Sequence, residues 1–294
     1  MDVLISGLNN YVGKRSLSLF ADDHFTVYAI TRNLKLFEKR LFEPMHATVY
    51  EGDLIKGAGS FPLNELELKA GIYFTQVPTL NDVVNLKLEI ICLRNFVHVL
   101  KQNSCQRVVY IARLMDKVCI EPVLSLLREL RVEYTVILKN CVIGHDSLVD
   151  RVIKNIANRK FIFYSKFYAT HALQPLGPRD FFRWLKLMLD VSAFKNRVIE
   201  LGGPHPMSLA DLFNKYKELE MVRTGQIIVD LPKWFVRLVY RKHLDISSTD
   251  HAEFSRIMRV SSTVNNDWRK QMPFRFSSIE QVLQEDLDLA KPSG

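Results

Sequence analysis

The chain has 294 residues, of which 48% are apolar and 24% charged, and it carries a net charge of +8 with a pI near 9.2. This composition excludes a disordered or fibrous protein, and the length suffices for one large domain or two modest ones. The positive charge is spread along the chain. Its densest run, residues 237–242, is short and typical of a solvated helix face, so no nucleic-acid partner is expected.

The four cysteines include no CxxC pair, and three of them sit inside apolar runs. This pattern favours reduced cysteines over a disulfide framework or a zinc site, and no metal is predicted. No stretch approaches the roughly 18 apolar residues that a membrane span needs. The first apolar run, residues 2–5, has no charged segment before it. The sequence therefore predicts a cytoplasmic protein without a membrane span.

Strands alternate with helices through the first half of the chain. Apolar runs rich in Val, Ile and Tyr predict strands over residues 3–6, 25–30, 47–50, 71–77, 107–112 and 133–138. Apolar residues at helical spacing predict a long helix over 82–101 and a shorter one over 122–130. This order is typical of an α/β protein with a Rossmann-type, doubly wound, mostly parallel sheet.

The second half is less regular. We expect a helix over 180–189, a strand over 197–201 that rejoins the sheet, and a helix over 209–220 capped by Ser208. Two or three further helices follow Pro232, the last over 279–290. The predicted domains are a dinucleotide-binding core, residues 1–145 rejoined by about 176–203, and a smaller, mainly helical lobe, residues 204–294 with about 146–175 contributing. Five aromatic residues would either line an apolar pocket in this lobe or belong to a core: Phe181, Phe182, Trp184, Trp234 and Phe235.

The motif that carries chemistry is Gly7-x-x-Asn10-x-x-Gly13, between the first strand and the first helix. Glycines there allow a tight turn, and the helix N-terminus offers N–H groups to phosphates. We therefore expect the stretch Gly7, Asn10, Tyr11, Val12 and Gly13 to hold a dinucleotide. Asn10 replaces the middle glycine. Asn tolerates a left-handed backbone, so the turn survives, but its side chain takes up space near the diphosphate position, and binding should be weakened or redirected.

The choice between NADP and NAD depends on the end of the second strand. An acid there would bind the ribose of NAD, whereas an arginine suits the 2′-phosphate of NADP. The chain offers Arg32 and no acid, and Lys14 could add a second charge. NADP is therefore the expected cofactor and NAD the less favoured one. The alternative is that Arg32 and Lys14 are ordinary solvated charges.

Residues 7–14 resemble the TGxxGxxG loop of the short-chain dehydrogenase/reductase superfamily, and most of all its atypical or extended, NmrA-like NAD(P)-binding branch. The run Gly52-Asp53-Leu54 resembles the GDL of that family. Residues 107–111 and 134–139 resemble its fifth and sixth strands, and residues 174–180 and 200–208 resemble later segments. The resemblance implies NADP binding, with Asp53 near the adenine ring and Leu54 beside it, although an acidic loop residue also serves as a cap.

Members of that superfamily use a tyrosine, a lysine four residues later and a serine for proton transfer. None of the ten tyrosines here has a lysine at that spacing, and Ala112-Arg113 stands where the serine is expected. The remaining candidates for catalysis are Tyr110, His171 and Lys117.

Three functions remain open. The first is an NADP(H)-binding protein that regulates or senses redox state through a protein partner. The second is an NAD(P)H-dependent oxidoreductase acting on a small molecule such as a quinone or carbonyl compound. The third is a scaffold that has lost its nucleotide. A homodimer is possible in each case.

Overall fold

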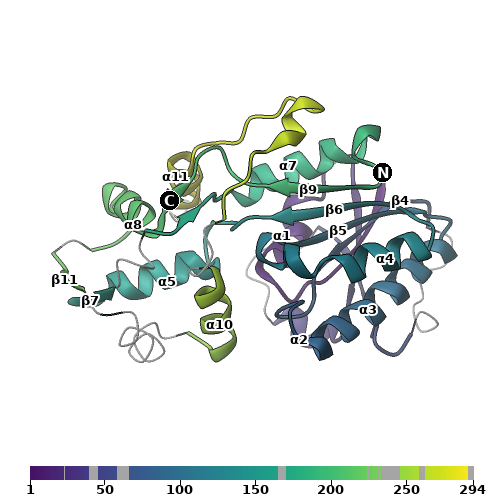
Figure 1. The fold of residues 1–294 in the computed structure, drawn as a ribbon, viewed down its shortest axis with the longest axis horizontal. Coiled ribbons are helices and arrows are strands. Elements are labelled where there is room, and N and C mark those ends of the chain that lie inside the picture. The colour runs from purple at the N-terminus through teal and green to yellow at the C-terminus, as the bar shows by residue number, and fades with distance from the viewer. Residues whose placement is uncertain are drawn as a thin grey trace. The chain divides into compact units, whose positions relative to one another are not determined.

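The computed structural model describes residues 1–22, 24–39, 46–57, 66–164, 170–223, 225–230, 232, 246–257 and 262–290. The chain divides into two compact units (Figure 1). The first unit comprises Met1–Lys139, Phe181–Leu201 and Asn266–Phe274, and the second comprises Asn140–Asp180, Gly202–Asn265 and Arg275–Gly294. Each unit is described by itself below.

The first unit is built on a seven-stranded parallel sheet with the order β3-β2-β1-β4-β5-β6-β9. Its strands are β1 (Asp2–Ser6), β2 (Thr26–Thr31), β3 (Thr48–Glu51), β4 (Leu68–Phe74), β5 (Arg107–Arg113), β6 (Glu133–Lys139) and β9 (Arg197–Leu201). The predicted α/β class with a doubly wound sheet is confirmed. The strand order reverses between β1 and β4, and ligands of such sheets bind at the carboxyl ends of the strands beside this switch point.

Helices cover both faces of this sheet because its strands are apolar on both faces. The α-helices of this unit are α1 (Tyr11–Leu19), α2 (Leu34–Glu38), α3 (Val83–Gln102), α4 (Glu121–Glu129) and α7 (Pro178–Leu189). It also has the short 3₁₀ helices η2 (Leu114–Cys119), η3 (Ser192–Phe194) and η4 (Asp267–Lys270). Figure 1 shows α3 and α4 along one face and α7 along the other. Successive β4 residues alternate between them: Tyr73 packs on Phe96 of α3, and Phe74 packs on Phe182 of α7.

β4 ends three residues earlier than the sequence predicts. Its apolar run continues to Val77, but the N–H groups of Gln76 and Val77 donate to the side-chain carboxylate of Glu89 rather than to a neighbouring strand. A buried acid on α3 therefore turns the chain out of the sheet, and this turn shapes the site described below.

The second unit contains four helices in the described part of the chain, α5 (Leu148–Ala157), α8 (Leu209–Glu218), α10 (Ser248–Ile257) and α11 (Ile279–Ala290). Two short strand pairs accompany them: β7 (Phe161–Tyr164) runs parallel to β11 (Ile227–Asp230), and β8 (Ala172–Leu173) runs antiparallel to β10 (Met207–Ser208). Tyr216 is buried in its core and donates a hydrogen bond to Asp150 at 2.8 Å. No described helix is long and apolar enough to cross a membrane.

Three of the five aromatic residues noted in the sequence belong to the core of the first unit. Phe181, Phe182 and Trp184 on α7 are fully buried. Trp184 also contacts Trp268 of η4 edge-to-face, with ring centroids 5.4 Å apart, which fastens residues 266–274 to this unit. Trp234 and Phe235 lie outside the described residues.

Candidate functional site

The turn between β1 and α1 requires its two glycines for different reasons. Gly7 has a φ of +89°, and a Cβ atom there would lie 2.0 Å from the carbonyl oxygen of Phe74. Gly13 lies inside α1, and a Cβ atom there would lie 2.3 Å from the carbonyl oxygen of Gly7. The first glycine therefore allows the backbone to turn against β4, and the second allows α1 to pack onto that turn.

Asn10 does not adopt the left-handed backbone that the sequence led us to expect. Its φ of −99° and ψ of 163° are extended, because Asn10 is the N-cap of α1. Its Oδ1 accepts the Gly13 N–H at 2.8 Å, and its Nδ2 donates to the carbonyl oxygen of Thr75 at 3.3 Å. The side chain thus joins the N-terminus of α1 to the end of β4.

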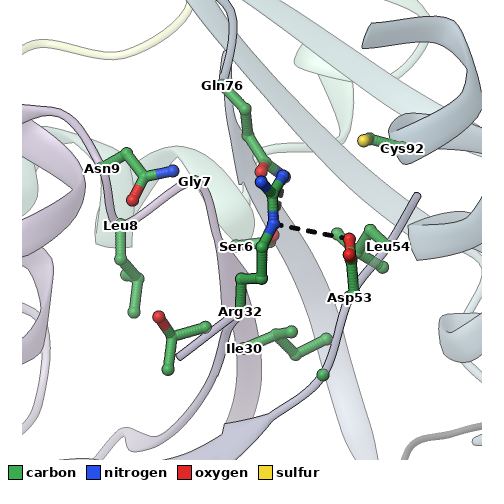
Figure 2. A pocket seen from close by; sticks show the side chains of 12 residues that line it. Ser6, Gly7, Leu8, Asn9, Ile30, Arg32, Asp53, Leu54, Gln76 and Cys92 are labelled. Atoms are coloured by element: carbon green, nitrogen blue, oxygen red, sulfur yellow. Dashed lines mark hydrogen bonds and ion pairs between the residues drawn. The ribbon is translucent and has the colours of Figure 1, made fainter. Parts of the chain in front are cut away.

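A hollow of about 360 Å³, counted with its open mouth, lies at the carboxyl ends of β1 to β4 (Figure 2). Its lining comes from the turn after β1, from the end of β2, from the turns after β3 and β4, and from α3. The lining residues are Ser6, Gly7, Leu8, Asn9, Ile30, Thr31, Arg32, Gly52, Asp53, Leu54, Gln76 and Cys92. The hollow therefore coincides with the place where the sheet topology predicts a nucleotide.

Arg32 and Asp53 provide the charge of this hollow. Figure 2 shows the Arg32 side chain extending from the end of β2, with its Nε 3.5 Å from Asp53 Oδ1. The Arg32 side chain is 61% exposed, so this ion pair contributes little to stability and leaves the guanidinium accessible to an anion. Asp53 also accepts the Ile55 N–H at 2.9 Å, so it caps its own turn.

The remaining predicted loop residues lie beside the hollow rather than in its lining. Tyr11 and Val12 form the first turn of α1, and Val12 is buried. Lys14 lies one residue past Gly13 on the same helix and is half-buried. Of the described residues, none of these three lines the hollow, and the predicted residues Asn10 and Gly13 do not line it either. The structure brings together Gly7, Arg32, Asp53 and Leu54.

Among the lining residues that the sequence prediction did not name, Gln76 and Cys92 lie farthest along the chain from its motifs. Gln76 follows β4, and its Nε2 donates to Ser6 Oγ at 3.1 Å, while Cys92 lies on the buried face of α3. Burial raises the pKa of the Cys92 thiol to about 11, so it stays protonated. Only the order of the strands could have indicated Gln76. Because β4 pairs with β1, the residues after β4 lie beside the turn between β1 and α1.

The turn after β4 is anchored by a buried carboxyl group. Glu89 is fully buried on α3, accepts the N–H groups of Gln76 and Val77 at 3.1 and 3.3 Å, and accepts the Tyr110 hydroxyl at 3.0 Å. Burial raises the pKa of Glu89 to about 7, against the opposing effect of these hydrogen bonds. Burial also raises the pKa of Tyr110 well above its usual value. This geometry makes Tyr110 a buried structural partner of Glu89.

Arg113 belongs to the pair Ala112-Arg113, where the family resemblance leads us to expect a catalytic serine. Its Nε donates to Asp116 Oδ2 at 2.7 Å, and its two terminal nitrogens donate to the carbonyl oxygens of Pro78 and Val77 at 2.5 and 3.2 Å. Asp116 is buried and also accepts the Leu80 N–H at 3.4 Å. Hydrogen bonds from Arg113 and to Asp116 therefore hold the turn after β4 against the end of β5, and the ion pair between Arg113 and Asp116 is structural.

The other two candidates for catalysis, Lys117 and His171, do not line the hollow. Lys117 on η2 forms an ion pair with Glu200 of β9, and its side chain is 60% exposed. His171 belongs to the second unit, just before β8. A catalytic role for either residue stays a prediction.

The residues present fit a nucleotide at one end of the site and resist it at the other. Around Arg32 and Asp53 the hollow is open and carries a cation suited to a phosphate. At the start of α1, Gly7 allows close backbone approach, but the Asn10 side chain already takes the Gly13 N–H.

No protein-family model and no curated protein sequence matches the chain. Several solved structures match the chain in fold. MoeE5, in complex with UDP-glucose and NAD, has a TM-score of 0.68 at 14% identity, with 98% of both chains covered. The UDP-glucose 4-epimerase of Thermotoga maritima, with UDP-glucose, has a TM-score of 0.67 at 11% identity, covering 98% of this chain and 99% of the other. The triphenylmethane reductase of Citrobacter sp., complexed with NADP(H), has a TM-score of 0.66 at 13% identity, covering 97% of this chain and 100% of the other.

These matches extend over both units, at identities that establish the fold alone. The chain therefore shares the fold of these solved structures, a parallel sheet of the Rossmann type with a smaller second unit.

Proposed function

We propose that this chain is an NADP(H)-binding protein of the NmrA-like type that acts through binding, as a regulator or redox sensor, and not through proton transfer of the usual kind. The observation that carries the proposal is the hollow at the switch point, with Arg32 exposed at the end of β2. A guanidinium at this place forms charge-assisted hydrogen bonds with a 2′-phosphate, which NADP has and NAD lacks.

The absence of the usual catalytic groups supports a binding role. Arg113 stands at the expected serine position and is held by Asp116 and by the turn after β4. Tyr110, the tyrosine nearest to that position on β5, is fully buried and donates to Glu89.

Exchanging the charge at Arg32 tests the proposal. Arg32→Glu should weaken NADPH binding about 30- to 100-fold, because the change removes charge-assisted hydrogen bonds to the 2′-phosphate and adds repulsion. NADH affinity should stay within about threefold, since NADH has no such phosphate. Isothermal titration calorimetry with both nucleotides measures the two changes.

Arg128→Glu is the matched control. It makes the same change of charge on the exposed face of α4, where Arg128 pairs with Glu121, and should leave both affinities unchanged. Equal losses for NADPH and NADH in Arg32→Glu, or no loss, would remove Arg32 from the binding site.

A second candidate function is an NADPH-dependent reductase of a small molecule. The likeness to triphenylmethane reductase, whose structure holds NADP(H) and spans nearly the whole chain, favours it. Steady oxidation of NADPH in the presence of quinones, enones or aldehydes would support this function over pure binding. A rate no higher than that of NADPH alone with every acceptor supports the binding role.

A further inference from the structure

We infer that the hollow binds its nucleotide together with a proton, which Glu89 takes up from solvent, so that anionic nucleotides bind more tightly as the pH falls. The inference rests on the proposed function and concerns the regulation of the same site. Glu89 is then a positioning residue, because it contacts the turn that lines the hollow and not the nucleotide.

One face of α3 carries the side chains that hold the walls of the hollow. Glu89 Oε2 accepts the Gln76 N–H at 3.1 Å, and Gln76 lines the hollow. Asn95 Nδ2 donates to the carbonyl oxygen of Leu54, another lining residue, at 2.7 Å. Cys92, which lies three residues from each on the same helix, lines the hollow itself. Glu89 is therefore separated from the hollow by a single hydrogen-bonded residue.

The charge of Glu89 is costly in this place. The side chain is fully buried, and burial raises its pKa to about 7 although its hydrogen bonds oppose the rise. An anionic nucleotide in the hollow would bring further negative charge close to the carboxylate. Because like charges disfavour ionisation, the bound nucleotide should favour the protonated acid. By linkage, the protonated protein then binds the nucleotide more tightly.

The hydroxyl groups beside Glu89 can accommodate the added proton. Tyr110 Oη lies 3.0 Å from Glu89 Oε1 and 3.2 Å from Thr75 Oγ1, which in turn lies 2.9 Å from the carbonyl oxygen of Ile111. When Glu89 is protonated, its Oε1–H can donate to Tyr110, Tyr110 to Thr75, and Thr75 to Ile111. Oε2 still accepts the backbone N–H groups of the turn. Protonation therefore leaves every hydroxyl with an acceptor and keeps the turn in place.

The other ionisable side chains that face Glu89 stay neutral near pH 7. They are Tyr73 on β4, Tyr110 on β5 and Cys92 on α3 itself. Burial raises the pKa of both tyrosines well above its usual value, and it raises the pKa of the Cys92 thiol to about 11. Of the described residues that line the hollow, none is a histidine.

The charged groups nearby are paired with each other. Arg113, at the end of β5, attracts the Glu89 carboxylate and opposes the rise of its pKa, but it also pairs with the buried Asp116 of η2 at 2.7 Å. In the hollow, Arg32 pairs with Asp53. Both pairs compensate their own charge, which leaves Glu89 as the buried group whose protonation responds to a bound anion.

Calorimetric titration of the full chain with NADPH, in two buffers of different ionisation enthalpy, counts the protons taken up. The wild-type protein should take up about half a proton per nucleotide at pH 7.5, and its dissociation constant should rise about fivefold from pH 6.5 to 8.5. The absence of proton uptake, or an affinity that is constant or increases with pH, overturns the inference.

Glu89→Gln separates the charge of Glu89 from its structural role, because the carboxamide has the shape and the hydrogen bonds of the protonated acid. This variant should lose most of the proton uptake and should bind NADPH at pH 8.5 at least threefold more tightly than the wild-type protein. A purely structural role would weaken binding at every pH. Proton uptake equal to that of the wild-type protein contradicts the inference.

Tyr110→Phe provides a second variant that keeps the carboxyl group. It removes a hydrogen bond that lowers the pKa of Glu89, so the proton uptake at pH 8.5 should increase about twofold. An unchanged or smaller uptake at this pH counts against Glu89 as the proton acceptor.

Glu129→Gln is the matched control. It makes the same change at an exposed acid of α4, which pairs with Arg94 of α3, and should leave both the proton uptake and the affinity unchanged. If the wild-type protein binds no NADPH at any pH, the proposed function fails and the inference fails with it. If it binds NADPH without proton uptake that depends on Glu89, only the inference fails.

Discussion

Glu89 is the residue that best illustrates how a single side chain shapes this site. It lies on the buried face of α3, a helix that otherwise presents apolar side chains to the sheet. Its carboxylate replaces the strand partner that Gln76 and Val77 would need, and so it ends β4 and sets the turn that lines the hollow. Burial of the acid is offset by three hydrogen bonds, which satisfy both oxygens.

Glu89 should make stability depend on pH in a predictable direction. Its pKa is about 7 in the folded protein and near the ordinary glutamate value of 4.5 in the unfolded chain. Between these values the unfolded chain loses a proton that the folded protein keeps, so the free energy of unfolding falls as the pH rises. The loss should reach about 3 kcal/mol by neutral pH and then level off. Urea denaturation from pH 4.5 to 8 measures it.

Glu89→Gln removes the ionising group but keeps the shape of the side chain. The free energy of unfolding of this variant should therefore lack most of the fall of about 3 kcal/mol that the wild-type protein shows between pH 4.5 and 8. Tyr110→Phe should move the fall in wild-type stability to higher pH, because the Tyr110 hydrogen bond lowers the pKa of Glu89. If the free energy of unfolding depends on pH in the same way for the wild-type protein and for Glu89→Gln, then Glu89 does not titrate in this range.

At the scale of elements, the contact between α3 and β4 is fixed by a glycine. A Cβ atom on Gly71 would lie 2.2 Å from Leu100 Cδ1, and Leu100 is fully buried on α3. Gly71→Ala should therefore lower the free energy of unfolding by about 1–3 kcal/mol through overpacking, and Leu100→Ala by about 2–5 kcal/mol through a cavity.

The two changes should compensate each other in part. The added methyl group occupies space that Leu100→Ala vacates, so the double variant should be more stable than the sum of the single effects by at least about 1 kcal/mol. Gly71→Ala combined with Leu127→Ala on α4 is the control and should be additive. Denaturant unfolding of the four proteins measures the coupling, and additivity in the first pair would refute the contact.

The elements that the sequence predicted are those with a long, continuous pattern. The strands of the main sheet and the helix α3 are clear because apolar residues repeat over several turns or fill a whole strand. The strand pairs of the second unit, two to four residues long, are too short to give such a signal. The amphipathic helix α5 was missed, although Ser147 stands at its start and caps it.

For the candidate site, the sequence supplied Gly7, Arg32 and Asp53 through local motifs. Gln76 and Cys92 could not be found that way, because only the placement of β4 and α3 beside β1 brings them to the hollow. The conformation of Asn10 could have been predicted from the sequence. An Asn directly before a helix is a favoured N-cap, and its side-chain oxygen then accepts the N–H of the third residue of the helix.

At the scale of the whole molecule, the first unit is assembled from three separate stretches of chain. β9 pairs with β6, α7 covers one face of the sheet, and Trp268 of η4 packs on Trp184. A fragment that ends at Lys139 has all the residues of the hollow but none of these additions. It exposes the apolar face under α7 and leaves the edge of β6 unpaired.

This fragment, residues 1–139, should therefore lack a cooperative thermal transition, whereas the full chain should show one. Circular dichroism during heating measures both. A cooperative melt of the fragment would show that the segment that lines the hollow folds without the returning segments.

The proposed function requires the first βα turn to hold the diphosphate of NADPH and Arg32 to hold its 2′-phosphate. The most direct test is a crystal structure of the full chain soaked with NADPH. We expect the 2′-phosphate within hydrogen-bond distance of the Arg32 guanidinium, the diphosphate over residues 7–13, and the Asn10 carboxamide turned away from the Gly13 N–H. A crystal with no nucleotide in the hollow at saturating NADPH, and with Asn10 still capping α1, would contradict it.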